Sequence, residues 1–333
     1  MSDESLRDIC ADFEGKSVVV TGGAGSIGRR LAAVLSSCAE VTVLDDLSSS
    51  SSYAPSDGIR FVNGSILETK SLREAMRSNP DYVFHLAALF ANQNSVEHPE
   101  QDLLVNSQGT LRVVDIALEY GVEALVYASS SCAYGGQGGV LSESQAPGEL
   151  ETPYAISKFT GELYLKYFAS ADDRSRLAAI RYFNVYGPGE LPGPYRNVIP
   201  KFARLAMLGE PLTITGTGEE TRDFTYIDDA VAGTLLAALR GKHGSVYNIG
   251  TGQETEIRRL IEMILKICDS QSEVIIGRRR SWDSTSARCA DISLARSVLG
   301  YSPSTSMEDG LKATLAWLDG RITQSGNDTS NLP

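Results

Sequence analysis

A tyrosine and a lysine stand four positions apart in the stretch ETPYAISKF, residues 151–159. Thr152 can cap a helix there, and Pro153 suits the first helical position. Tyr154 and Lys158 then share one face of the helix, one turn apart. A phenol and an ammonium group at this spacing can act as an acid–base pair, because the cation stabilises the phenolate. A surface helix can also carry such a pair only for solubility, so the surrounding elements must decide.

A glycine-rich turn, VVVTGGAGSIG at residues 18–28, places Gly22, Gly25 and Gly28 between an expected strand and an expected helix. Glycines permit a tight turn and a close approach of the backbone, and the helix N-terminus offers N–H groups to a pyrophosphate. Asp45 ends the next expected strand, roughly 20 residues further on, where a carboxylate takes the ribose hydroxyls. With no arginine beside it to receive a 2′-phosphate, NAD is favoured over NADP. The alternative is an ordinary strand–helix turn.

The elements that position these residues alternate between apolar strands and amphipathic helices. Such continuous apolar strands, separated by helices, predict an α/β fold with a doubly wound parallel sheet of the Rossmann type. Strands are expected at residues 16–22, 40–46, 59–65, 82–89, 124–131 and 177–187, and helices at 27–37, 71–78, 103–121 and from Tyr154 onward.

The second half of the chain is less regular and begins with a stretch rich in proline and glycine, residues 187–197. We expect an NAD-binding domain at 1–183, a smaller substrate-binding region at 184–320, and a mobile tail at 321–333. Segments near 222–252 are expected to return to the first domain. The Ser-rich loop 47–58 is also expected to be mobile. Further helices are predicted near 198–208, 228–240, 256–268 and 307–318, and strands near 212–215 and 246–249.

The composition excludes several classes of function. Hydrophobic residues make up 42% of the 333 residues and charged residues 22%, which is typical of a soluble globular protein. The net charge of −12 argues against nucleic acid as a partner. Only three histidines occur, so no metal site is expected. The sequence has no apolar run that could span a membrane and no signal-peptide pattern at its start, MSDESLRDICADFEG. The odd number of cysteines, five, without a CxxC pair indicates free thiols in a reducing, cytoplasmic environment.

Three serines, Ser129 to Ser131, end the fifth expected strand at the sheet edge where open α/β sheets bind ligands. Taken alone, they could simply satisfy the loop backbone. They belong, however, to a series of motifs that covers nearly the whole chain: TGGAGSIG, LDDLSS, HLAAL, VNSQGT, SSSCAYG, PYAISK, RYFNVYGPG, RNVIPKF and GTGEETRDFTYIDDA. On these motifs the sequence resembles the extended short-chain dehydrogenase/reductase family, and within it the nucleotide-sugar epimerases such as UDP-glucose/UDP-galactose 4-epimerase.

The resemblance implies that Ser130, Tyr154 and Lys158 are catalytic. A tyrosine with a pKa near 10 needs roughly 4 kcal/mol of stabilisation of its anion to act as a base at neutral pH. Lys158 and the nicotinamide ring are the available positive charges, and Lys158 would also hold the nicotinamide ribose. The implied NAD contacts are Gly22, Gly25, Ser26, Ile27, Gly28, Asp45, Asp46, Leu47, Ser48, Ser65, Ile66, Leu86, Ala87, Ala88, Asn106, Tyr154, Lys158, Tyr182 and Phe183.

The substrate contacts that the resemblance implies are Ser130, Asn184, Asn197, Arg222, Arg280, Asp283 and Ala287. Arg222 and Arg280 would grip the diphosphate, because arginine pairs with phosphate in a bidentate manner. Arg280 could instead belong to a solvated basic run, residues 277–281. Ala287 falls on a gate position near C2 of the sugar, where a small residue admits N-acetylated sugars.

Departures from the family narrow the expected reaction. Ser131 and Cys132 stand where the dehydratases carry Asp and Glu, and the decarboxylases also carry a glutamate at the second position, so elimination lacks its acid and base. Ser65 replaces an aspartate that contacts adenine, which weakens that contact. Cys132 can also be no more than a small buried side chain, and His85 a satisfied strand histidine.

The prediction is therefore a nucleotide-sugar 4-epimerase that oxidises C4 transiently with bound NAD. A UDP-sugar is favoured as substrate, although neither base nor sugar can be named. The alternatives are a dehydrogenase, reductase or decarboxylase of the same fold, or a non-catalytic NAD-sensing protein. The family implies a homodimer through the helices at 103–120 and 154–169, and neither a nucleic acid nor a membrane is expected as a partner.

Overall fold

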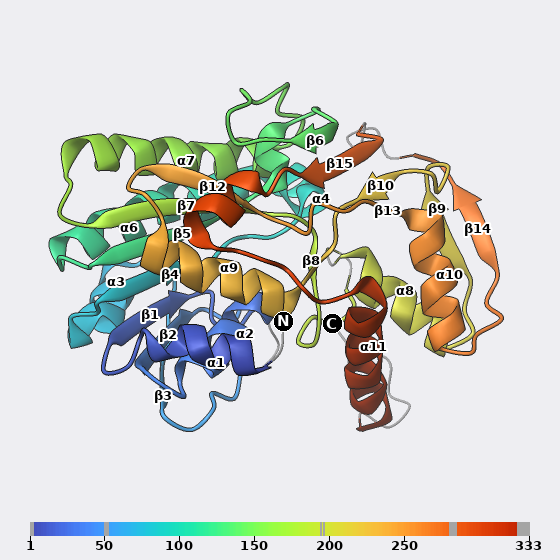
Figure 1. Ribbon diagram of the computed structural model, residues 1–333, viewed down its shortest axis with the longest axis horizontal. Helices are drawn as coiled ribbons and strands as arrows, with labels where there is room; N and C mark the ends of the chain where they lie inside the picture. Colours follow the sequence, from blue (N-terminus) through green and yellow to red (C-terminus); the bar gives the residue numbers. More distant parts are fainter. Residues whose placement is uncertain (1–2, 50–52, 194, 196, 280–284, 325–333) are drawn as a thin grey trace.

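A parallel sheet of seven strands forms the centre of the computed structural model, which describes residues 3–49, 53–193, 195, 197–279 and 285–324 (Figure 1). Across the sheet the strand order is β12–β7–β5–β4–β1–β2–β3. The strands are β1 (Ser17–Thr21), β2 (Glu40–Asp45), β3 (Ile59–Asn63), β4 (Tyr82–His85), β5 (Ala124–Ser130), β7 (Arg176–Tyr182) and β12 (Ser245–Ile249). The first strand of the chain, β1, lies inside the sheet, and the later strands are added on both sides of it. The sheet is therefore doubly wound, as predicted.

Helices cover both faces of this sheet. On one face lie α1 (Asp3–Ala11), α2 (Ser26–Leu35) and α9 (Ile227–Arg240), and on the other α3 (Thr69–Ala75), α6 (Thr110–Glu119) and α7 (Pro153–Ala171) (Figure 1). Successive strand residues point to opposite faces, so Val18 and Val20 join the core under α2 and α9, whereas Val19 joins the core under α6. Burial on both faces explains the uninterrupted apolar runs of the sequence.

A smaller lobe lies beyond the carboxyl ends of these strands. It contains α8 (Val198–Met207), α10 (Ile257–Ile267) and α11 (Met307–Gln324), and the strand pair β9 (Leu212–Thr215) and β14 (Val274–Gly277). These elements share a core of their own around Phe202, Leu260 and Leu311. Between them in sequence, α9 and β12 lie on the large sheet, β12 pairing with β7. The division of the chain at residues 183 and 184 remains a prediction.

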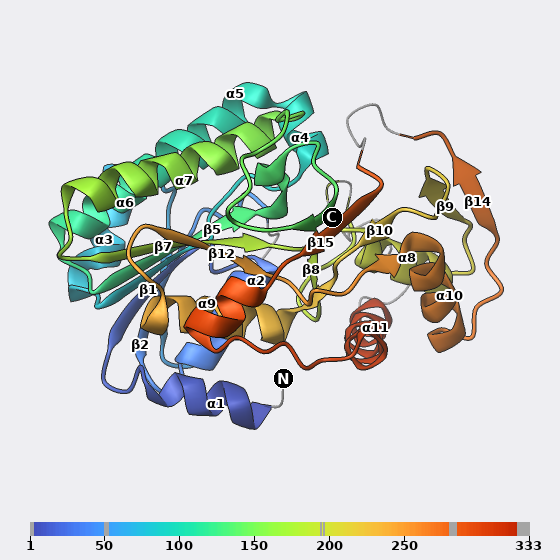
Figure 2. The same ribbon diagram turned by 45° about the horizontal axis from the view of Figure 1, so that its top comes forward.

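A four-stranded sheet, β13–β10–β15–β6, stands between the large sheet and the smaller lobe (Figure 2). Its strands are β13 (Thr255–Glu256), β10 (Thr221–Arg222), β15 (Ala287–Ala290) and β6 (Gly139–Leu141). Pairing of β15 with both β10 and β6 brings the last third of the chain beside the loop that follows β5.

Several elements differ from the sequence-based expectations. The strand expected at 177–187 is divided, because the chain leaves the large sheet after Tyr182 and forms β8 (Val185–Tyr186), which pairs with β11 (Thr225–Tyr226). The helix expected at 103–121 begins earlier, with α5 (Pro99–Asp102), and continues through a π-helical stretch, Leu103–Gly109, into α6. The last helix reaches residue 324 rather than 318, so the start of the expected mobile tail is helical. The remainder of that tail and residues 50–52 of the Ser-rich loop lie outside the described residues.

The expectation that all five cysteines are free thiols is wrong. Cys10 at the end of α1 and Cys38 after α2 form a disulfide, with 6.2 Å between their Cα atoms. The sequence alone could not reveal this pair, because packing of α1 beside α2 brings together cysteines 28 positions apart. The argument for a reducing compartment therefore loses its basis. Among the helices in the described ranges, none has the length and apolar character needed to cross a bilayer.

Candidate active site

A cavity of about 500 Å³ lies where the carboxyl ends of the large sheet meet the smaller lobe. The turn after β1 and the ends of β2, β4 and β5 line one side of it. α8, β9, β10 and β15 contribute side chains from the other side. The cavity therefore lies at the edge of the sheet where doubly wound folds bind their ligands.

The glycine turn forms a close-packed cradle at one end of this cavity. Gly22 has a φ of +72°, and a Cβ added there would lie 2.5 Å from the backbone nitrogen of Ala87. A Cβ added at Gly28 would lie 2.2 Å from the carbonyl oxygen of Gly22. Only glycine fits these two positions without a shift of the backbone. The cradle thus keeps the space and the helix N-terminus that a pyrophosphate requires.

Asp45 lies beside the cradle at the end of β2. Its carboxylate accepts hydrogen bonds from the backbone N–H groups of Ala24 (2.9 Å) and Leu47 (2.8 Å). Burial raises the pKa of Asp45, and these two donors oppose the rise. Arg29 also acts electrostatically on Asp45, which contradicts the expectation of no arginine nearby. Its guanidinium lies over the ring of Tyr53, and Arg29 does not line the cavity, whereas Asp45 does.

Most of the residues expected to contact NAD line the cavity: Gly22, Gly25, Ser26, Ile27, Gly28, Asp45, Asp46, Ser48, Ile66, Leu86, Ala87, Ala88, Tyr154, Lys158 and Tyr182. Leu47, Ser65, Asn106 and Phe183 do not. The Asn106 side chain instead binds the backbone N–H (2.8 Å) and carbonyl (3.0 Å) of Leu89, so it holds the loop after β4. Phe183 belongs to the apolar core.

The three expected catalytic residues lie close together on the cavity wall. Ser130 ends β5, and Tyr154 and Lys158 lie in the first turns of α7. The predicted start of this helix is confirmed, because the Thr152 hydroxyl accepts a hydrogen bond from the backbone N–H of Ala155 and Pro153 is the first helical residue. The Lys158 ammonium donates to the carbonyl of Ala128 (2.9 Å) and lies 5.7 Å from the centre of the Tyr154 ring.

Burial sets the protonation of this group. It raises the pKa of Tyr154 well above its ordinary value, and the hydrogen bond with Ser130 opposes the rise. It lowers the pKa of Lys158 to about 8, against the opposing effect of the Asp102 carboxylate. Tyr154 can therefore become a base only if positive charge beside it stabilises the phenolate.

Sequence reasoning missed three polar residues around this group. The Asp102 carboxylate accepts from Asn106 Nδ2 (2.7 Å), and the one-turn spacing of these two residues is a signal that could have revealed it. The Asn92 side chain accepts from the Thr152 hydroxyl (2.8 Å) and donates to Cys132 Sγ (3.5 Å). The third is Arg288 on β15.

Only some of the residues expected to bind the substrate line the cavity. Asn184, Asn197 and Arg222 line the cavity. Arg280 and Asp283 lie outside the described residues. Ala287 does not line the cavity, whereas its neighbour Arg288 does. Because side chains alternate along a strand, an error of one residue moves the gate position to the opposite face of β15. The gate role of Ala287, with room for an N-acetyl group, therefore stays a prediction.

Comparisons with known proteins agree with this arrangement. Residues 18–250 match the model of the NAD dependent epimerase/dehydratase family. The chain is 32% identical to a UDP-N-acetyl-alpha-D-glucosaminuronate decarboxylase of Bacillus cytotoxicus, over 91% of this chain and 97% of that protein. Among solved structures, an epimerase of Methanothermobacter thermautotrophicus is 40% identical and superposes with a TM-score of 0.88, over 97% of this chain and 98% of the other. The UDP-glucose 4-epimerase of Thermotoga maritima, solved with UDP-glucose, is 31% identical with a TM-score of 0.87, over 92% and 99%.

The family description names NAD, and three features of the cavity fit this cofactor. They are the glycine cradle, Asp45 at the end of β2, and the Ser130–Tyr154–Lys158 group. The family match covers more than half of the chain and spans every one of these residues. The chain therefore belongs to the NAD dependent epimerase/dehydratase family, and NAD is its cofactor.

Proposed function

We propose that this protein is a nucleotide-sugar 4-epimerase. The observation that carries the proposal is that one cavity is lined by the glycine cradle, by Ser130, Tyr154 and Lys158, and by Arg222. A sugar nucleotide whose diphosphate lies near Arg222 would present its sugar to these three residues. The relative solved with UDP-glucose supports a UDP-sugar as the substrate.

The residues divide the work at C4 of the sugar. The glycine cradle, Asp45 and Lys158 would hold NAD, which would supply a hydride acceptor and donor for C4. Tyr154 removes the proton of the C4 hydroxyl, and Ser130 binds the same oxygen through its hydroxyl. Lys158 stabilises the Tyr154 phenolate, since it supplies the chain's own positive charge at this point. The 4-keto sugar must rotate within the cavity before the hydride returns to the opposite face of C4.

A second candidate is a decarboxylase, because one of the relatives above has that activity. Cys132 stands where the decarboxylases carry a glutamate, so the side chain expected to assist that reaction is missing. This departure favours epimerisation, in which the sugar loses no atoms.

We further propose that the protein is a homodimer. Apolar side chains are exposed on α7 and on the neighbouring helical stretch: Leu103 (61%), Leu104 (45%), Ile156 (50%), Leu163 (49%) and Tyr167 (64%). Ile156, Leu163 and Tyr167 are spaced seven and four positions apart, which places them on one side of α7. An apolar surface of this kind marks a protein–protein interface.

The test is to incubate the purified protein with UDP-sugars and no added cofactor, and to follow the products by NMR. We expect both C4 epimers to appear without a stoichiometric change in the absorbance of reduced nicotinamide. Stoichiometric reduction of NAD would indicate a dehydrogenase. A pentose product would indicate a decarboxylase, and the absence of turnover would indicate an NAD-sensing protein.

Replacing Tyr154 with Phe tests the mechanism. We expect turnover to fall by roughly 10²- to 10⁴-fold while NAD stays bound, because only the proton acceptor is lost. Tyr164→Phe makes the same chemical change further along α7 and serves as the control. Activity of Tyr154→Phe within a few-fold of the control would remove Tyr154 from the mechanism.

A further inference from the structure

Arg288 is a second arginine of the cavity wall, held in place from one side. Its Nη2 donates to the carbonyl of Gly135 (2.6 Å) and to the Thr285 hydroxyl (3.2 Å). Its Nη1 lies 4.0 Å from Cys132 Sγ. These contacts point the guanidinium toward the loop that follows β5 and leave Nη1 with only the long contact to the thiol, at a residue that lines the cavity.

The charge of Arg288 is not matched by a protein acid. In the described part of the chain no carboxylate pairs with it, and its Nε is buried without a hydrogen-bond partner. The acids of the cavity wall are engaged elsewhere. Asp45 accepts from a backbone N–H group of the cradle and Asp46 from the backbone N–H of Ser48. Glu190 accepts from Asn197, and Glu220 accepts from residues 217 and 218. Because a partly buried cation without a partner is costly, such a group is expected to find its counterpart in a ligand.

The position of Arg288 selects the part of the ligand that it meets. Arg222 and Arg288 are register partners on β10 and β15, so their side chains leave the sheet on the same face. The Arg222 guanidinium binds the carbonyls of Thr221 and Ser286. Arg288 points the other way, to Cys132, which is close enough to act electrostatically on both Tyr154 and Lys158. Arg288 therefore contacts the loop that directly follows Ser130, whereas Arg222 contacts the backbone of β10 and of the segment before β15.

We propose that Arg288 binds a carboxylate on the sugar, so that the substrate is a nucleotide-linked acidic sugar, with a uronic acid as the first choice. The inference rests on the proposed function for the placement of the sugar at Tyr154. A carboxylate would accept a charge-assisted hydrogen bond from Nη1, which has no close protein acceptor, and would supply the missing negative charge. A neutral hydroxymethyl group would accept one hydrogen bond but leave the charge uncompensated.

Binding measurements by calorimetry on the NAD-loaded protein test this proposal. The ligands are UDP, UDP-glucose, UDP-glucuronate, and UDP-N-acetylmuramate, which carries its acid on a lactyl ether instead of on C6. We expect UDP-glucuronate to bind more tightly than UDP-glucose. In Arg288→Gln that preference should fall by about 10- to 100-fold, the range expected for a hydrogen-bonded charge. Arg288→Lys keeps the charge and should retain part of the preference.

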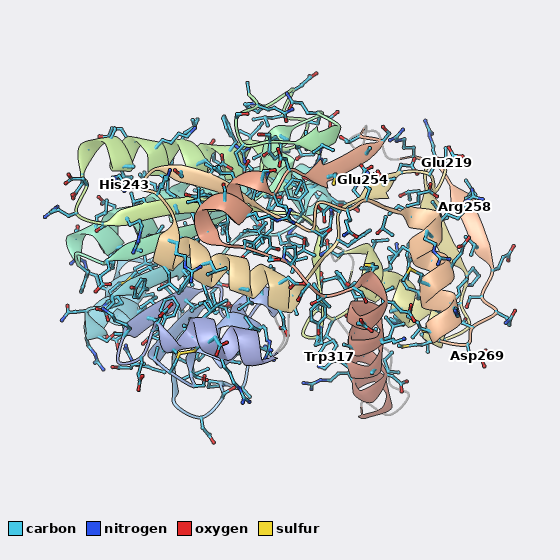
Figure 3. The ribbon with its side chains drawn as sticks, viewed as in Figure 1. Glu219, His243, Glu254, Arg258, Asp269 and Trp317 are labelled. Atoms are coloured by element: carbon cyan, nitrogen blue, oxygen red, sulfur yellow. A yellow bond between two sulfur atoms is a disulfide. The ribbon has the colours of Figure 1, made fainter. Side chains whose placement is uncertain are left out.

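Arg258→Gln is the matched control, because it removes one arginine charge from α10 on the outer side of the smaller lobe (Figure 3). It should leave the ratio of the two affinities unchanged. The proposal is overturned if wild type prefers UDP-glucose. It is also overturned if Arg288→Gln weakens UDP, UDP-glucose and UDP-glucuronate by one common factor, since Arg288 would then bind the diphosphate. A preference for UDP-N-acetylmuramate over UDP-glucuronate supports carboxylate binding and moves the acid from C6 to the lactyl group.

Turnover is measured separately, so the two proposals can fail independently. If the acidic sugar binds preferentially through Arg288 but is not epimerised, the 4-epimerase function is wrong and the carboxylate site stands. If UDP-glucose is epimerised and Arg288→Gln leaves the ratio of affinities unchanged, the function stands and the carboxylate site is wrong. Circular dichroism and NAD content confirm that each variant is folded.

Discussion

Replacing Arg181 with Met should destabilise the protein by about 3–5 kcal/mol, because it leaves a buried carboxylate without its cation. Arg181 on β7 and Glu162 on α7 are joined by two hydrogen bonds, Nε to Oε1 (2.9 Å) and Nη2 to Oε2 (2.6 Å). The exposed fractions of the two side chains are only 4% and 0%. Ser129 also donates to Glu162 Oε1 (2.5 Å), so the pair lies directly behind the strand end that carries Ser130.

The double variant separates the cost of a broken pair from the value of the pair itself. The double variant Glu162→Met/Arg181→Met removes both buried charges of the pair. Replacement of a buried ion pair by apolar residues is often neutral or stabilising. Ser129 then loses its acceptor, and the contact of the Arg181 guanidinium with the Tyr134 ring, at 4.3 Å, is lost as well. Each of these losses costs about 1 kcal/mol. We therefore expect the double variant to be more stable than either single variant.

Urea unfolding followed by circular dichroism, with NAD at saturation, measures these free energies. The exposed pair of Arg174 and Asp172 provides the control, and Arg174→Met should change the unfolding free energy far less than Arg181→Met. The reasoning is refuted if Arg181→Met costs less than about 1 kcal/mol, or if the losses of the two single variants simply add in the double variant.

Three further predictions concern the cofactor site and the core. Gly28→Ala should weaken NAD binding, because the new Cβ would lie 2.2 Å from the Gly22 carbonyl oxygen. Gly320→Ala is the control, because the space around Gly320 is open. Equal affinities of the two variants for NAD, measured by calorimetry, would contradict the prediction. Asp45→Ala should weaken NAD and relax the preference over NADP, and unchanged affinities for both would mean that Asp45 does not bind the ribose. Burial lowers the pKa of His85 to about 3, so below pH 6.5 the unfolded chain binds a proton that the folded chain does not. As the pH falls from 6.5 to 4, the unfolding free energy of wild type should therefore decrease by about 1.4 kcal/mol per pH unit relative to that of His85→Gln. Urea unfolding at several pH values measures both free energies, and an equal dependence on pH in the two proteins would refute the prediction.

Short-range patterns in the sequence were sufficient to predict the sheet and much of the cavity wall. The glycine turn and the capped start of α7 each lie within about ten residues, and their conformations follow from local chemistry. Apolar runs placed the seven strands because a parallel sheet buries both of its faces. The roles of Ser130, Tyr154 and Lys158 remain predictions, although the structure brings the three residues together.

The features that sequence analysis missed depend on contacts between distant parts of the chain. Cys10 and Cys38 pair because α1 packs beside α2, and Asn92 reaches Thr152 across 60 positions. Nothing in the neighbouring residues of either pair indicates such a contact.

The sequence by itself determined the glycine turn and the positions of the strands along the chain, since both depend on residues that are close together in sequence. Only the tertiary structure decided which side chain of β15 lines the cavity. The direction of a side chain on a short strand depends on register, and pairing with β10 and β6 places Arg288, not Ala287, on the cavity wall. A shift of one residue reverses the face of the strand, and no local pattern in residues 285–290 specifies that register.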